Sequence, residues 1–438
     1  MKSLRKEKER LKQGIEVEGY IRTIEEIEAM DNSLFHGKPY RRIRRPSFPD
    51  EINDLLLDSD YLWKRPHWDT GDCTEIDLNP RKHLGDFRDL LVNALTQVYD
   101  YSDRKEYLYM LLGVVPVSRY AGAHQHLSFY NYSNTELIYK LYVFQPFISL
   151  LGQNSSLVRK SKYVKDTNGS DYYLPYYVPS NTKDTRIEYE RGGLTSHDFK
   201  TDYDCDDIED QEEYEQCMEE CENIGMLDPD FELHTLEVRY PSSASLYQTL
   251  GVATFLKACV YQKGNILQDG DYDWELTKML EGILSLGSLT PVDLYYKEKS
   301  VRTNIGTLFD MLIDSPVFRE GLEEALSELD VRDQIEVMKF YRIFGKGLSM
   351  TDYYNEILKN KTVLEACKAL HREEELEFFK GYNIIDRYKP KPSFDKEEAR
   401  YIMSSVPSID ARVYGIEDQI EKVVDKTNLS LSLPFSIK

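Results

Sequence analysis

The segment GIEVEG, at residues 14–19, places Glu16 and Glu18 at alternate positions among small and apolar residues. This alternation predicts a β-strand, which we expect over residues 13–24, because successive side chains of a strand point to opposite faces of a sheet. The two carboxylates then project together from one face, and the apolar residues between them pack on the other. The segment therefore predicts a strand that is acidic on one side and buried on the other.

Two further segments carry functional side chains at the same spacing. The alternate polar residues are His124, His126 and Ser128 in GAHQHLS (122–128), and Glu237 and Arg239 in HTLEVRY (234–240). Taken singly, such a segment is more often a solvated face or a surface ion pair than a site. A sheet face that collects all three segments is costly to desolvate unless metal or anionic ligands compensate its charges. Their joint occurrence therefore favours a functional site.

The composition describes an acidic globular chain. Hydrophobic residues make up 41% of the 438 residues, which is enough for a large core, and the net charge is −22. An acidic surface repels phosphate backbones, so we expect no nucleic-acid partner. No apolar run approaches the roughly 20 residues that cross a bilayer, and the N-terminus lacks the apolar segment of a signal peptide. The six scattered cysteines fit reduced thiols, and we expect a cytoplasmic protein without a membrane partner.

Hydrophobic periodicity predicts an α+β fold. The expected strands lie at 13–24, 73–78, 108–118, 121–130 and 234–240, and the expected helices at 82–99, 133–151 and 243–261. Beyond residue 270 only helical stripes follow. We therefore expect a catalytic domain over residues 1–268, with a curved, mainly antiparallel sheet, helices on its outer face and an acidic insertion at about 198–230. Residues 269–438 would form an all-helical C-terminal region.

The three polar segments, in this order, resemble the signature strands of the glutamine synthetase superfamily. Within it they look like those of glutamate–cysteine-ligase-like and amidoligase-type carboxylate–amine ligases, some of which are encoded by bacterial viruses. The resemblance covers about residues 14–265 and implies a glutamine-synthetase-like fold. It also implies an enzyme that uses ATP and Mg²⁺ or Mn²⁺ to join a small glutamate-like carboxylate to an amine through an acyl phosphate. The resemblance leaves open whether the protein forms a homo-oligomer. If the protein is viral, it would act in the host cytoplasm.

The resemblance also implies roles for single residues. The expected metal ligands are Glu16, Glu18, Glu75, His124 and Glu237. The expected catalytic residues, at the phosphate or the substrate, are Arg239, His126, Arg186 and Arg191. The expected cofactor contacts are Arg159, Asn154 and Ser128. This set agrees with the chemistry, because divalent cations and arginines neutralise the charge of a transferring phosphoryl group.

Other classes of function compete with the ligase. An amidohydrolase barrel also begins its metal site with H-x-H on a strand, but it needs about eight strand–helix units, which a helical C-terminal third cannot supply. An amide hydrolase on the ligase fold is harder to exclude. A non-catalytic assembly or scaffold protein is disfavoured, because an idle site has no reason to keep buried charge. The ligase further predicts that Glu16, Glu18, His124 and Glu237 converge in space.

Overall fold

A computed structural model describes most of the chain. The described residues are 11–40, 51–52, 55–56, 66–68, 73–117, 121–128, 137, 140–154, 157–179, 199–200, 236–262, 273–358, 361–371 and 406–420. Arg186, Arg191, the predicted start of a helix at 133 and nearly all of the acidic insertion lie outside these residues. Within them, no helix is long and apolar enough to span a membrane.

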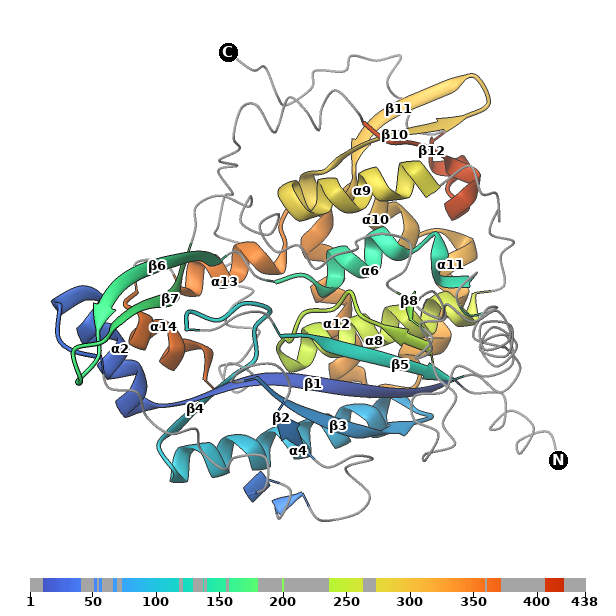
Figure 1. Cartoon of the computed structure of the whole chain (residues 1–438). Coiled ribbons are helices and arrows are strands. Elements are labelled where there is room, and N and C mark those ends of the chain that lie inside the picture. The colour runs from blue at the N-terminus through green and yellow to red at the C-terminus, as the bar shows by residue number, and fades with distance from the viewer. Residues whose placement is uncertain are drawn as a thin grey trace, which may run out of the picture.

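The main sheet is built around β1 (Lys12–Thr23), which runs through its centre (Figure 1). The other strands are β2 (His67–Trp68), β3 (Cys73–Arg81), β4 (Tyr107–Met110), β5 (Ala123–Ser128), β8 (Phe199–Lys200) and β9 (Leu236–Val238). Their order is β2-β3-β1-β5-β9-β8, with β4 paired to the end of β1. Every pair is antiparallel, which confirms the predicted sheet and excludes the parallel barrel among the described strands.

Helices α4 (Leu84–Arg104) and α8 (Leu246–Tyr261) cover the apolar side of this sheet. Ile15 and Val17 of β1 are buried there, and the side chain of Gln13 donates to the carbonyl of Ala253 in α8 at 3.0 Å. Alternation then directs Glu16 and Glu18 to the opposite face. Helix α4 contacts β3, β4 and α8. The helices therefore lie on the outer face, as predicted, and leave the polar face to the site.

Among the described elements up to residue 200, the short strands β2 and β8, one helix and one two-stranded ribbon have no counterpart among the predictions. Helix α2 (Ile24–His36) follows β1 directly, and its N-cap Thr23 accepts from the backbone N–H of Glu26. The tyrosine-rich connection forms an antiparallel ribbon of β6 (Leu157–Lys165) and β7 (Asp171–Pro179). The predicted strand at 108–118 is regular only in β4. The helix predicted to end near 151 is represented by α6 (Gln145–Gly152).

The region after residue 269 is mixed, so the prediction of an all-helical C-terminal region is wrong. Its helices are α9 (Asp273–Leu286), α10 (Ile305–Ile313), α11 (Pro316–Leu326), α12 (Val331–Gly345), α13 (Met350–Leu358) and α14 (Val363–Leu370), with 3₁₀ turns at Gly287–Leu289 and Ala411–Tyr414. Strands β10 (Pro291–Tyr296) and β11 (Lys299–Asn304) form a hairpin, and β12 (Ser408–Asp410) joins β10 in parallel. The turn between β10 and β11 places Lys297 at φ 56°, without the glycine or asparagine that usually marks such a turn.

Helix α8 is buried along nearly its whole length, between the sheet and helices α11 and α12. Its one lysine, Lys257, is 0% exposed. The Nζ atom of Lys257 lies 2.6 Å from Oε2 of Glu328 and donates to the carbonyl of Lys82 at 2.6 Å. Glu328 in turn accepts from the backbone N–H of Leu84, at the start of α4. This buried pair ties α8, α4 and the loop after α11 together.

Removing one partner of this pair should unfold the protein more readily. We expect Lys257→Ala to lower the free energy of unfolding by about 3–5 kcal/mol, because the carboxylate of Glu328 would stay buried without its cation. The double variant Lys257→Met with Glu328→Leu should recover part of the loss, since it leaves no buried charge. Denaturant unfolding measures both. A single variant that loses less than about 1 kcal/mol would contradict this expectation.

Candidate active site

The strand register collects the predicted polar residues on one face of the sheet. The cross-strand pairs are Glu16 with His124 and with Asp77, Glu18 with Glu75, and His126 with Glu237. Residues paired across antiparallel strands point to the same face, as do alternate residues along one strand. The predicted convergence of Glu16, Glu18, His124 and Glu237 is therefore confirmed, while their chemical roles remain predictions.

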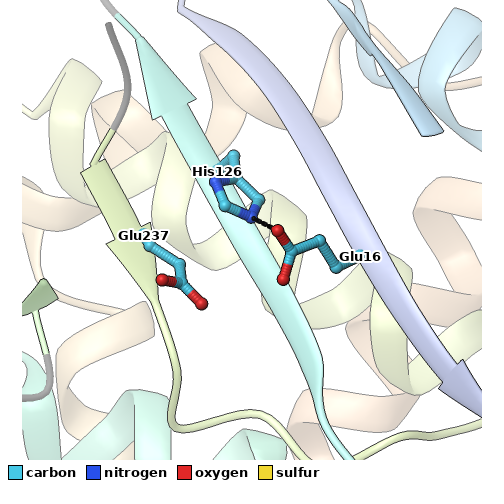
Figure 2. A group of neighbouring side chains, drawn as sticks. All are labelled: Glu16, His126 and Glu237. Carbon is cyan, nitrogen blue, oxygen red and sulfur yellow. Dashed lines mark ion pairs between the residues drawn. The ribbon is translucent and has the colours of Figure 1, made fainter. Parts of the chain in front are cut away.

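Glu16 is the centre of this face. Its Oε1 lies 2.9 Å from Nε2 of His126, and its Oε2 lies 3.1 Å from Nδ1 of His124. The same Nδ1 of His124 lies 3.1 Å from Oε1 of Glu237. Figure 2 shows Glu16, His126 and Glu237 reaching toward one another from three adjacent strands. Both imidazoles are at most 2% exposed, so these contacts form out of water.

Two groups of side chains have the composition and spacing of metal ligands. Ligand atoms of Glu16, His126 and Glu237 lie within 4.8 Å of one another, and so do those of Glu16, Glu75 and Asp77. Carboxylate oxygens bind Mg²⁺ at about 2.0–2.1 Å, so small side-chain shifts would let either group close on a cation. Glu16 belongs to both groups and could serve two neighbouring ions. These donors fit Mg²⁺ or Mn²⁺ held mainly by oxygen.

His124 balances the charge of the carboxylates. Burial alone would lower the pKa of its imidazole, but the hydrogen bonds to Glu16 and Glu237 outweigh burial and raise the pKa to about 9. Burial would likewise raise the pKa of the Glu16 and Glu237 carboxyls, yet the imidazoles hold both below their usual range. At neutral pH the metal-free site therefore contains a protonated His124 between two carboxylates.

Metal binding should release the proton of His124, because a divalent cation takes over the carboxylates that stabilise the imidazolium. We expect about one proton to be released below pH 9, and the apparent metal affinity to rise with pH up to that value. In the metal-free protein, the ion pairs of protonated His124 stabilise the fold. This contribution is complete below pH 6.5, the ordinary pKa of histidine, and is lost as the pH rises through about 9.

Calorimetry of Mn²⁺ binding in buffers of different ionisation enthalpy counts the released protons. His124→Gln provides the control and should release none. A metal affinity that stays constant between pH 6 and pH 9 would show that His124 keeps its proton when the ion binds.

Arg239 lies at the open edge of the cluster. Its Nη1 lies 2.6 Å from Oε1 of Glu237, and its side chain is 38% exposed. Burial opposes its charge, but Glu237 raises the pKa of the guanidinium further above its ordinary value. The residue therefore combines one anchored nitrogen with a partly open face, as an anion contact requires. Ser128 is half-buried at the end of β5, on the same face as His126 by alternation.

Two predicted cofactor contacts, Asn154 and Arg159, lie outside the polar face. Asn154 is 0% exposed, and its amide contacts protein groups: it accepts from Gly113 and donates to Ser243 and Gln248. The structure thus gives this amide to protein contacts instead of to a cofactor. Arg159 lies in β6, and its side chain is not among the described ones.

Two residues of the site escaped the sequence analysis. Asp77 is 1% exposed and continues the alternation of Glu75 along β3, a pattern visible in the segment TEID. Gly122 donates its backbone N–H to the Glu18 carboxylate. A Cβ atom at Gly122 would lie 2.2 Å from Nε2 of His124, so only glycine lets this imidazole fold back over the strand. No signal in a single sequence marks a glycine that makes room for a side chain.

Comparison with known proteins gives matches among solved structures alone. No protein-family model matches the chain, and no curated protein matches it. The chain is similar to glutamate–cysteine ligase from Francisella tularensis in complex with AMP, with 11% identity, a TM-score of 0.46 and coverage of 98% of this chain and 96% of that one.

Two further structures have comparable similarity. The first is the complex between the prokaryotic ubiquitin-like protein Pup and its ligase PafA, with 9% identity, a TM-score of 0.43 and coverage of 97% and 84%. The second is a glutamine synthase homologue, with 12% identity, a TM-score of 0.36 and coverage of 83% and 72%. At these levels of similarity, the functional argument rests on the residues of the site.

Proposed function

We propose that this protein is an ATP-dependent carbon–nitrogen ligase that joins a carboxylate to an amine with the help of Mg²⁺ or Mn²⁺. The observation that carries the proposal is the polar face centred on Glu16, where two groups of metal-type ligands share one carboxylate. A buried cluster of this charge is costly to maintain without ligands. The motifs that resemble the glutamine synthetase superfamily supply the same residues.

Each residue has a defined task in this proposal. Glu16, Glu75 and Asp77, with Glu18 paired beside Glu75, would hold one cation. Glu16 and Glu237, with His124 or His126, would hold the other. Bound cations would neutralise charge on the phosphoryl group of ATP as it moves to the substrate carboxylate. Arg239 would direct its open face to the same phosphate, anchored by Glu237 at 2.6 Å.

The proposed reaction has two steps. The substrate carboxylate takes the γ-phosphoryl group and forms an acyl phosphate, with ADP as the leaving group. The amine then attacks the acyl carbon, phosphate leaves, and the amine nitrogen loses its proton. His126 and Ser128, on the same face, are placed to contact the carboxylate substrate. A glutamate-like acid is the proposed donor, with an amine as acceptor.

The proposal extends to the setting of the enzyme. We retain the division into a catalytic domain at 1–268 and a C-terminal region at 269–438, the latter now with strands. Arg159, Arg186 and Arg191 are proposed to contact nucleotide phosphates. Among the described residues, Cys73, Cys259 and Cys367 are buried and form no disulfide, which supports action in a reducing cytoplasm.

ATP consumption with a panel of carboxylates and amines tests the proposal. We expect ADP release that needs both a divalent metal and a carboxylate, and hydroxylamine should trap the acyl phosphate as a hydroxamate. Amide cleavage without ATP would favour the hydrolase on the same fold. A protein that neither binds Mn²⁺ nor consumes ATP would favour the scaffold.

A further inference from the structure

A buried polar network lies next to the strand that carries Glu18. Its members are Asn154, Ser243 and Gln248, each 0% exposed. They come from different parts of the chain: the segment just after α6, the segment after β9 and the first turns of α8. Burying three polar side chains destabilises a fold unless their hydrogen bonds are satisfied. The contacts of the network therefore show what it holds in place.

Asn154 connects the other two members. Its Nδ2 donates to the carbonyl of Ser243 at 2.8 Å and to Oε1 of Gln248 at 3.0 Å. Its Oδ1 accepts from the backbone N–H of Gly113 at 3.0 Å. Gln248 donates onward to the carbonyl of Leu151 at 2.9 Å. The backbone carbonyl of Ser243 is thus fixed by Asn154, whose own amide is held by Gly113 and Gln248.

Ser243 connects the network to Glu18 through a hydrogen bond. Its Oγ donates to the backbone carbonyl of Glu18 at 2.5 Å, and its backbone N–H donates to the carbonyl of Ala121 at 2.9 Å. The neighbouring Gly122 accepts from the backbone N–H of Glu18 at 3.0 Å and donates its own N–H to the Glu18 carboxylate. Ser243 therefore holds the carbonyl of Glu18, and Gly122 holds its N–H and its carboxylate. The hydrogen bond from Ser243 to Ala121 connects these two segments.

We propose that Ser243 and Asn154 are positioning residues that fix the Glu18 carboxylate on the metal-binding face. This inference rests on the proposed function, because it assigns Glu18 to the metal centre. Residues that orient a ligand support metal affinity although they never touch the ion. Here the network reaches Glu18 through its main chain, so a change at Ser243 moves the carboxylate without altering its charge.

The test is Mn²⁺ binding, measured by the spin-resonance signal of the free ion. Ser243→Ala should weaken Mn²⁺ binding by about 10- to 100-fold, the range typical of residues that orient a ligand. Ser102→Ala is the matched control, since Ser102 is also 0% exposed and donates its hydroxyl to a backbone carbonyl, that of Val98 at 2.8 Å. Ser102 lies near the end of α4, outside the network, so its variant should bind Mn²⁺ like the parent.

Asn154→Asp provides a second test that preserves side-chain volume. It keeps the acceptor for Gly113 but removes the donors to Ser243 and Gln248, and it should also weaken Mn²⁺ binding. If Ser243→Ala melts below the assay temperature, Asn154→Asp decides the question. Variants that bind Mn²⁺ within about twofold of Ser102→Ala would overturn the inference.

The design also separates this inference from the proposed function. A parent protein that binds Mn²⁺, loses binding in both variants and consumes no ATP would refute the ligase while supporting the positioning role. A parent that consumes ATP and has variants with unchanged metal dependence would support the ligase and refute the positioning role.

Discussion

Replacing Glu16 with glutamine should lower metal-dependent ATP turnover by at least about 1,000-fold, because metal and oxyanion stabilisation each contribute several kcal/mol. Glu16 is the carboxylate that both candidate metal groups share, so one neutral amide weakens both. The substitution also removes the anion that pairs with His124 and His126 at 3.1 and 2.9 Å. The expected loss therefore exceeds that of any carboxylate that belongs to one group.

Steady-state ADP release across a Mg²⁺ titration measures this effect, with thermal melting to confirm folding. Glu26→Gln is the matched control, because the Glu26 side chain has a similar exposure (10%, against 16% for Glu16) and also forms an ion pair, with Arg22 at 3.6 Å, but lies in α2. We expect the Glu26 variant to keep its turnover. A folded Glu16→Gln variant with turnover within tenfold of the parent would rule out the shared-carboxylate arrangement.

The sequence predicted the site well where alternation alone determines geometry. In β1, β5 and β9 the side chains at every second position must share a face, so Glu16 could be grouped with Glu18, His124 with His126, and Glu237 with Arg239 before any coordinates. That the three segments meet was implied by the resemblance. Which strands are neighbours could not follow from alternation. That depends on the long-range pairing of β1 with β3, which also brings Asp77 opposite Glu16.

The contacts of the two histidines were beyond the sequence for a related reason. Both lie on the polar face and both reach Glu16, and the H-x-H pattern cannot show which nitrogen reaches which carboxylate. The resemblance favoured His124 as the ligand, whereas the group with ligand spacing contains His126. The structure places Nδ1 of His124 at 3.1 Å from both Glu16 and Glu237, so its role as a ligand stays a prediction.

Two further differences between prediction and structure concern the β10–β11 hairpin and Asn154. The hairpin of β10 and β11 turns at Lys297, which has a positive φ, and the turn contains no glycine or asparagine that would predict it. The resemblance implied that Asn154 contacts the cofactor, yet its side chain is completely buried in the fold. No local signal in the sequence marks the turn at Lys297, and the contacts that enclose Asn154 come from residues distant in the sequence.

Replacing Arg239 with lysine should lower kcat by about 100- to 1,000-fold, the effect of losing one preorganised donor at a developing negative charge. Lysine keeps the charge but not the planar fork, so it cannot contact Glu237 and two phosphate oxygens together. Charge accumulates between those oxygens mainly during transfer, so we expect ATP binding to change much less than kcat.

Glu237→Gln should give the opposite kinetic pattern. The amide removes a metal ligand and leaves Nη1 of Arg239 without its charged partner at 2.6 Å. We expect the Mn²⁺ concentration for half-maximal turnover to rise by about 10- to 100-fold, and excess Mn²⁺ to restore part of the activity. Added metal should not restore Arg239→Lys, because its metal ligands are intact. Measured together across a metal titration, the two variants separate phosphate stabilisation from metal binding. If both fold and consume ATP like the parent, β9 is a structural strand and the ligase proposal fails.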